Sequence, residues 1–128
     1  MALNASLKSI SESAFSDDRL MIDISDFTKV EMHVGTITAA ELNSKAIQPA
    51  NVLTIDFGPK GVKTSSAQVT EHYTPEELVG LQVVAVTNFP SRRIAGIKSE
   101  VLVLASTGND GTVLLSPTLR VSNGSRIA

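Results

Sequence analysis

The side chains best suited to chemistry in this sequence fall within one short segment, residues 88–100. Two uncharged apolar runs, residues 83–86 and 101–104, flank this segment, which carries too much charge to be buried. It is therefore predicted to be an exposed polar connection between two buried strands, a common place for binding residues. Its amide, guanidinium, ammonium, hydroxyl and carboxylate groups belong to Asn88, Arg92, Arg93, Lys98, Ser99 and Glu100.

The basic residues of this segment suit anionic ligands. Guanidinium groups bind phosphate through paired hydrogen bonds and stack on bases, which fits RNA. Because Arg92 and Arg93 are adjacent, an extended backbone would point them to opposite sides, one toward a ligand and one toward the protein. Lys98 is interpreted either as a phosphate contact or as a solvated lysine. Glu100 is interpreted either as a hydrogen-bond acceptor for a ligand or as an internal ion-pair partner, and the amide and hydroxyl groups either as ligand contacts or as strand caps.

A second set of polar side chains lies on a predicted strand of small residues, 62–69. Small uncharged donors and acceptors let a peptide or an RNA strand approach closely, so this strand is a candidate groove wall. The alternative is a strand whose small residues allow tight packing against a helix or another subunit. Together with one residue of the first predicted strand, the candidate groove residues are His33, Ser65, Ser66 and Gln68.

The sequence offers little for catalysis or metal binding. It has no cysteine, which excludes thiolate chemistry, disulfides and cysteine-ligated metal sites. Its two histidines, His33 and His72, lack the spacing of metal ligands, and no serine stands in a nucleophile-elbow pattern. A glycine-rich phosphate-binding loop is also absent. We therefore expect no enzyme, no metal and no organic cofactor.

Length and composition favour one small domain. The chain has 128 residues, of which 42% are hydrophobic and 19% charged, enough for one hydrophobic core. Its net charge of −2 means that a site for a polyanion would be a local basic patch with salt-sensitive affinity. No apolar stretch is long enough to span a bilayer, and residues 1–7 lack the features of a secretory signal. We expect a cytoplasmic protein without membrane insertion.

Apolar alternation predicts a mainly β chain. The strand candidates are residues 30–42, 51–57, 62–69, 82–88, 100–106 and 112–116. In the first of them the alternation slips at Gly35, which suggests a bulge or a bend. Residues 74–80 carry a threonine cap, a proline, two acids and a final glycine, which are the signals of a short helix. A tight turn at 108–111 predicts a hairpin over 101–115.

These elements match an all-β, five-stranded OB-fold barrel with a short helix between strands 3 and 4. Residues 1–22 are a separate serine-rich region with apolar residues at helical spacing, which predicts an N-terminal amphipathic helix. Residues 25–29 predict a capped helical turn that leads into the barrel. The expected organisation is an extension at 1–22 and an OB-fold domain at 23–128.

Four separated motifs go beyond the fold class. They are DFTKVEMHVGTI at 26–37, LTIDFG at 53–58, SSAQV at 65–69 and NFPSRRIAG at 88–96. In this order they resemble the tRNA-binding OB-fold family, whose module is similar to the C-terminal extension of bacterial methionyl-tRNA synthetase. The third and fourth motifs resemble those of the CsaA-type export chaperones, a stand-alone branch of the family. The resemblance covers residues 24–128.

The resemblance implies a homodimeric barrel without a metal or an organic cofactor. It also implies binding of unfolded or export-bound polypeptide and, in some members, of tRNA. A departure from the family is His33, where arginine is common, so a fixed positive charge is lost. By position, the residues that match the family's ligand-binding motif are Asn88, Arg92, Arg93, Lys98, Ser99 and Glu100.

The leading hypothesis from the sequence is a CsaA-like molecular chaperone that holds unfolded or export-bound polypeptides and also binds tRNA. The alternative is a stand-alone tRNA-binding module acting in trans, which the basic residues of 88–100 favour. A third hypothesis is a dimeric scaffold for one specific protein. The chain has only five aromatic residues, four Phe and one Tyr, so a broad base-stacking surface is not expected.

Overall fold

The computed structural model describes residues 21–128 of the chain, which divides into two units, Met1–Val30 and Glu31–Ala128. In the first unit, residues 21–30 are described and contain α2, Ile24–Thr28. The Asp26 carboxylate accepts a hydrogen bond from the Asp23 amide at 3.0 Å and so caps this helix. The helical turn predicted at 25–29 is confirmed. The helix predicted at 1–22 lies, except for its last two residues, outside the described residues.

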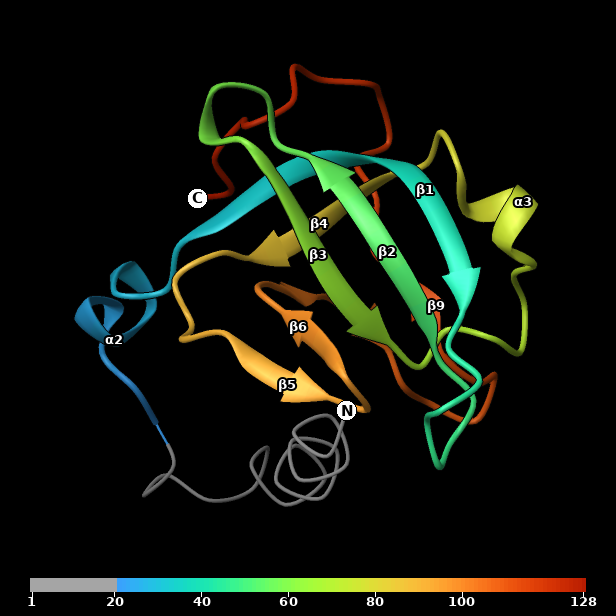
Figure 1. Cartoon of the computed structure of the whole chain (residues 1–128). Coiled ribbons are helices and arrows are strands. Elements are labelled where there is room, and N and C mark those ends of the chain that lie inside the picture. The colour runs from blue at the N-terminus through green and yellow to red at the C-terminus, as the bar shows by residue number, and fades with distance from the viewer. Residues whose placement is uncertain (1–20) are drawn as a thin grey trace. The chain divides into compact units, whose positions relative to one another are not determined.

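The second unit is an all-β barrel (Figure 1). Its main sheet is antiparallel, with the strand order β3-β2-β1-β4-β7, and two small antiparallel pairs, β5-β6 and β8-β9, accompany it. The strands are β1 Met32–Leu42, β2 Asn51–Asp56, β3 Val62–Ala67, β4 Gln82–Val86, β5 Arg92–Ile94, β6 Ile97–Ser99, β7 Leu102–Val103, β8 Ala105–Ser106 and β9 Val113–Leu114. The helical elements are the 3-10 turn η2 Gly58–Lys60 and the α-helix α3 Pro75–Leu78. The five-stranded sheet curls into a nearly closed OB-type barrel, so the predicted fold class is confirmed.

Helix α3 forms where its sequence signals predict it, between β3 and β4. The Glu77 amide donates to the Thr74 hydroxyl at 3.3 Å, and the Thr74 amide donates to the Glu77 carboxylate at 3.0 Å. This reciprocal capping box satisfies two amides that a helix start leaves without partners. Gly80, with φ of +96°, turns the chain out of the helix. The capped turn holds the fully buried Leu78 against the core.

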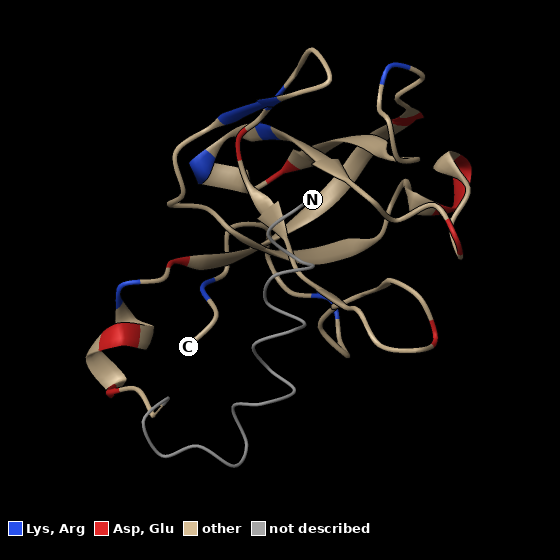
Figure 2. Cartoon of the chain, turned by 90° about the horizontal axis from the view of Figure 1, so that it is seen from below, with Lys and Arg blue, Asp and Glu red and all other residues tan. Residues whose placement is uncertain are grey.

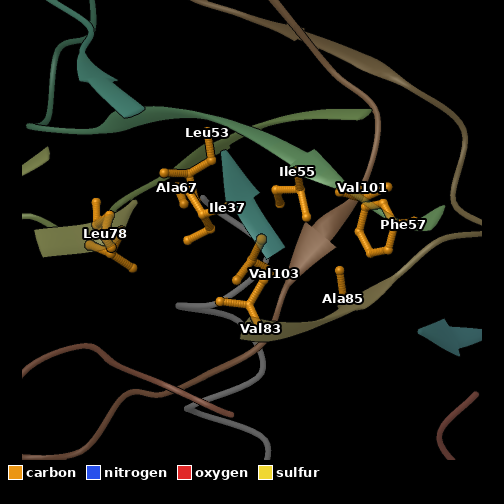
Figure 3. Packing of buried hydrophobic residues seen from close by; sticks show 11 residues of the cluster. Ile37, Leu53, Ile55, Phe57, Ala67, Leu78, Val83, Ala85, Val101 and Val103 are labelled. Carbon is orange, nitrogen blue, oxygen red and sulfur yellow. The ribbon is translucent and has the colours of Figure 1, made fainter. Parts of the chain in front are cut away.

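The core of the barrel is one cluster of aliphatic side chains around a single aromatic ring (Figure 3). Strand β2 presents Leu53 and Ile55 inward and is followed by Phe57, and all three side chains have no exposed surface. This is the alternation that the sequence of residues 51–57 predicts. Figure 3 shows the Phe57 ring and Leu78 on opposite sides of the cluster. Helix α3 therefore covers one part of the core while Phe57 fills another.

Hydrogen bonds between β3 and the segment that leads into β7 bring the two edges of the sheet together. The Glu100 amide donates to the Thr64 carbonyl at 2.8 Å, and the Ser65 hydroxyl donates to the Val101 carbonyl at 3.0 Å. Closing a sheet in this way removes edges that would otherwise present unpaired backbone groups. The small residues of β3 thus form the seam of the barrel.

The C-terminal residues run along the first half of β1 as a strap, residues 120–127. The Val34 amide donates to the Ser125 carbonyl at 2.9 Å, and the Gly124 amide donates to the Val34 carbonyl at 2.7 Å. The Ile127 amide then donates to the Met32 carbonyl at 2.9 Å. Strand β4 pairs with one edge of β1, through residues that alternate with those that bond the strap. The strap therefore protects the opposite edge of β1.

Gly35 has a different structural reason from the one its sequence suggests. The irregularity in β1 pairing lies between Ile37 and Ala39, so the bulge is three residues further along. A Cβ atom at position 35 would lie 2.6 Å from Ile55 Cγ2 and 2.8 Å from the Phe57 ring. The glycine is therefore required by the close approach of two core side chains, a role that strand alternation does not reveal.

Replacing Gly35 with alanine is expected to destabilise the barrel by about 1–3 kcal/mol, the usual cost of overpacking a filled core. The new methyl group would have to displace Ile55 or the Phe57 ring, both fully buried. Urea unfolding followed by circular dichroism measures the change. The matched control is Gly108→Ala, since a Cβ atom at Gly108 meets no atom within 4 Å. Equal midpoints for the Gly35→Ala variant and the unmodified protein would contradict the packing described.

Candidate nucleic-acid interface

Much of segment 88–100 is a β-hairpin rather than the open connection that its charge suggests. Strands β5 and β6 pair with Arg92 opposite Ser99, Arg93 opposite Lys98 and Ile94 opposite Ile97. A two-residue turn, Ala95 and Gly96, joins them. The sequence signal for this hairpin was Ala95-Gly96 between two isoleucines, a short turn pattern that the surrounding charged residues obscured.

The register of this hairpin places two cations on one face. Residues directly opposite in an antiparallel pair share a face, so Arg93 and Lys98 project together, and both are exposed. Arg92 shares the other face with Ser99, whose side chain is buried, but Arg92 itself is exposed. Like charges directly opposite one another repel, and an anion bound between them would relieve that repulsion. The predicted divergence of the two arginines is confirmed by this register.

The hairpin is fixed to the barrel through β3. The Ser66 amide donates to the Ser99 hydroxyl at 3.1 Å, and the Thr64 hydroxyl donates to the Lys98 carbonyl at 2.6 Å. Both bonds tie β6 backbone or side-chain atoms to the seam of the barrel. The cations of the hairpin are therefore carried on a supported element and not on a free loop.

The Glu100 side chain is held by hydrogen bonds from Thr64 of the adjacent strand β3. Its carboxylate accepts hydrogen bonds from the Thr64 amide and the Thr64 hydroxyl, each at 3.1 Å. Burial alone would raise the pKa of this carboxyl, but the two Thr64 hydrogen bonds and the nearby Lys63 and Lys98 lower the pKa overall. Glu100 thus stays ionised between two lysines. Lys63, which the sequence did not single out, joins the basic cluster through its place beside Thr64.

Two of the candidate groove residues point inward. The Ser65 side chain has no exposed surface and bonds to the Val101 carbonyl, and Ser66 is 3% exposed within the seam. Within residues 21–128 they therefore line no open surface, and their smallness serves the close packing of β3. This burial favours the alternative of tight packing for these two serines. Gln68, at the end of the same segment, is half-buried.

Asn88 joins the ends of two strands. Its side-chain oxygen accepts a hydrogen bond from the Glu31 amide at 3.0 Å, immediately before β1. The Thr87 amide donates to the Glu31 carbonyl at 2.9 Å beside it. This contact matches the capping alternative for Asn88, and the side chain remains exposed.

His33 is buried, at 2% exposure, and does not share the hairpin surface. Its Nδ1 lies 2.8 Å from the Thr87 hydroxyl, and its backbone forms an isolated antiparallel bridge with Arg126 of the strap. Burial lowers the pKa of the imidazole, and Lys60 and Arg126 lower it further, while Glu31 raises it. His33 is therefore a neutral interior residue at neutral pH.

Acidification is expected to destabilise the barrel through His33. Since the folded pKa lies below the ordinary value of 6.5, stability is full above pH 6.5 and falls as the pH drops from 6.5 through the folded pKa. The measurement is the urea midpoint between pH 7 and pH 5. His33→Gln, which cannot titrate, should show a smaller decline than the unmodified protein. An equal decline for the two proteins would rule out His33 as the cause.

The structure thus brings together part of the predicted set. Arg92, Arg93 and Lys98 lie on the hairpin with Lys63 on the adjacent strand, and Figure 2 shows basic positions gathered on this side of the barrel. Ser99 and Glu100 support the cluster from inside. Within residues 21–128, no group of three or more His, Asp or Glu side chains is placed to hold a metal ion. No helix in this part of the chain is long and apolar enough to cross a membrane.

The fold and the site define a small OB-type barrel that presents a basic hairpin. The family profile that matches residues 32–126 is tRNA_bind, described as "Putative tRNA binding domain", and the chain belongs to this family. Within it, the chain is of the CsaA type. The crystal structure of chaperone CsaA from Bacillus anthracis is 48% identical, with a TM-score of 0.80 over 84% of this chain and 99% of that one. The CsaA chaperone protein from Picrophilus torridus is 43% identical, with the same TM-score over 84% of this chain and 100% of that one.

A relative of a second kind is the methionine–tRNA ligase of Porphyromonas gingivalis. It is 36% identical over 107 residues, which make up 83% of this chain and 15% of the ligase. The chain therefore corresponds to a small part of that enzyme, whereas it spans nearly the whole of each CsaA chain.

Proposed function

We propose that this chain is a CsaA-type tRNA-binding protein whose β5–β6 hairpin contacts the phosphate backbone of tRNA. The observation that carries the proposal is the exposed cation pair of Arg93 and Lys98, facing the same way on a supported hairpin. Arg92 on β5 and Lys63 on the adjacent strand β3 add two further cations. Binding here needs no cofactor and no catalytic group, because it rests on charge and hydrogen bonding alone.

The number of cations sets how strongly salt should weaken this binding. Each neutralised phosphate makes the slope of log affinity against log salt more negative by about 0.9 for double-stranded regions. Four cations therefore give a slope no steeper than about −3.6. The experiment is a fluorescence titration of tRNA at several salt concentrations. A slope between about −2 and −3.6 would support the proposal. A slope near zero, or no binding at low salt, would refute it.

A second activity, holding unfolded or export-bound polypeptide, is favoured by a different observation. The chain matches two CsaA chains named as chaperones over nearly their full length, and it exposes large apolar side chains, including Ile47 and Phe89. Exposed apolar surface with a polar rim is the physical requirement for such binding. The test is light scattering of a denatured client with an equimolar amount of this protein. An unchanged scattering curve would exclude this activity, and competition by tRNA would place both ligands on one surface.

We further propose a cytoplasmic homodimer, as the resemblance to the CsaA type implies. Apolar side chains exposed on and beside the strap, Leu81, Leu119 and Val121, offer surface for a second copy. Light scattering coupled to size-exclusion chromatography measures the mass. A mass of about 13.5 kDa at micromolar concentration would exclude the dimer.

A further inference from the structure

The turn at the tip of the β5–β6 hairpin has a backbone conformation that its sequence does not favour. Ala95 and Gly96 both have positive φ, 49° and 82°, as the central residues of a type I′ turn do. Glycine adopts this conformation freely, whereas the Cβ atom of Ala95 opposes it. Among residues 21–128, Ala95 is the one non-glycine residue with a positive φ. Each strand of the hairpin has only three residues, so the tip needs support from outside.

Asn43, in the loop between β1 and β2, supplies that support. Its side-chain Nδ2 donates a hydrogen bond to the Ala95 carbonyl at 3.4 Å. Its side-chain oxygen accepts from the Lys45 amide at 3.0 Å, and its own amide donates to the Ala50 carbonyl at 3.0 Å. The loop therefore fixes the Asn43 backbone and one end of its amide group, and the other end reaches the hairpin tip.

The neighbouring carbonyl of the same turn is bound by the proposed site itself. Nη1 of Arg93 donates to the Gly96 carbonyl at 3.4 Å, so the guanidinium lies against the turn that Asn43 holds. A change in the turn would move this guanidinium relative to Lys98, its cross-strand neighbour. Asn43 can therefore control the spacing of the two cations although it carries no charge.

We propose that Asn43 is a positioning residue for the binding of tRNA phosphates by the hairpin. It holds the strained turn so that Arg93 and Lys98 keep one fixed spacing before the ligand arrives, which lowers the cost of ordering them on binding. This inference rests on the proposed function of the hairpin. It also makes the β1–β2 loop and the hairpin one connected unit in ligand binding.

The test begins with Asn43→Ser, which keeps a short acceptor for the Lys45 amide but removes the donor to Ala95. We expect tRNA affinity to fall about 3- to 10-fold, the range that one hydrogen bond sustains. The salt slope should stay unchanged, because every cation remains. Amide hydrogen exchange of residues 92–99 should become faster. The matched control, Gln48→Ala in the exposed part of the same loop, should change neither affinity nor exchange.

A rescue distinguishes positioning from a general structural role. Asn-Gly is the sequence that a type I′ turn favours, so Ala95→Asn should make the turn stable without outside support. The double variant Asn43→Ser, Ala95→Asn should therefore recover most of the lost affinity and the slow exchange. Failure of the rescue would overturn the positioning role.

The outcomes separate this inference from the function on which it rests. Unchanged exchange of the hairpin in Asn43→Ser would show that Asn43 does not hold the turn. Faster exchange with unchanged tRNA affinity would show that the turn does not position the cations. If instead the variant Arg93→Ala, Lys98→Ala binds tRNA as tightly as the unmodified protein, the proposed function fails, whatever the exchange of the Asn43 variant shows.

Discussion

Replacing Arg93 and Lys98 together by alanine is expected to weaken tRNA binding on the order of 50-fold at 0.1 M salt. These two side chains project from the same face of the hairpin, and both are exposed to a ligand. Losing two phosphate contacts should make the slope of log affinity against log salt less steep by about 1.8. Over the tenfold change from 1 M to 0.1 M salt, this difference in slope corresponds to the expected loss of affinity. The measurement is the dissociation constant of tRNA at several salt concentrations.

Folding should not be responsible for this loss. Their removal relieves the repulsion between the two cations across the strands and also removes the Arg93 hydrogen bond to the Gly96 carbonyl, so the stability of the hairpin should change little. The matched control removes the same charge elsewhere, through Lys60→Ala and Arg126→Ala, two residues whose fields act on His33. This control should lower affinity by less than about threefold, through the general field alone. Equal losses for the two double variants would mean that net charge, and not the hairpin, governs binding.

The Phe57→Ala substitution is expected to produce the largest loss of stability, about 3–5 kcal/mol. Among residues 21–128, Phe57 is the largest side chain without exposed surface, and its removal leaves a cavity beside Gly35 and Ile55. For a domain of this size the melting temperature should fall by roughly 12–20 °C. Differential scanning calorimetry measures both quantities.

The matched control for this substitution is Phe57→Leu, which refills most of the cavity and should cost about 1.5 kcal/mol or less. A melting temperature for Phe57→Ala within a degree or two of the unmodified protein would contradict the packing of the core. The variant Arg93→Ala, Lys98→Ala should show the opposite result, because it should retain its stability and lose tRNA binding. The two substitutions thus separate the scaffold from the surface it carries.

Local patterns in the sequence predicted the scaffold well. The alternation of β2 follows directly from one buried face, and the capping signals of residues 74–80 gave α3 in the right place. The turn at 108–111 predicted the pairing of β8 with β9, which is confirmed. Each of these features depends on residues close together in the chain, and local chemistry is what a sequence shows most clearly.

The features that sequence patterns misplaced depend on contacts between distant segments. Gly35 was interpreted as a bulge or a bend because strand alternation cannot show that Ile55 and Phe57 approach it. The sequence left Ser65 between a groove and tight packing, because a small polar residue looks the same at a seam as at a surface. The same reason explains His33, whose backbone bridges to Arg126 of the C-terminal strap, almost a hundred residues away along the chain.

The predicted site segment forms a basic surface whose shape the sequence did not indicate. The charged residues of 88–100 indicated a basic surface, and Arg93 with Lys98 provides one. What the sequence did not indicate was the hairpin register that aligns these two cations, the contribution of Lys63, or the contact of Asn43 with the turn. These three features arise from strand pairing and from a loop some fifty residues away.

The most direct test of the hairpin as the tRNA-binding surface is an NMR titration of the isotope-labelled protein with tRNA at low salt. Chemical-shift changes should concentrate on residues 92–99, with smaller changes at Lys63, Thr64 and the loop around Asn43. The amides of the strap should change little. Shifts centred on the strap and on η2, with the hairpin unmoved, would contradict the assignment of this surface to tRNA.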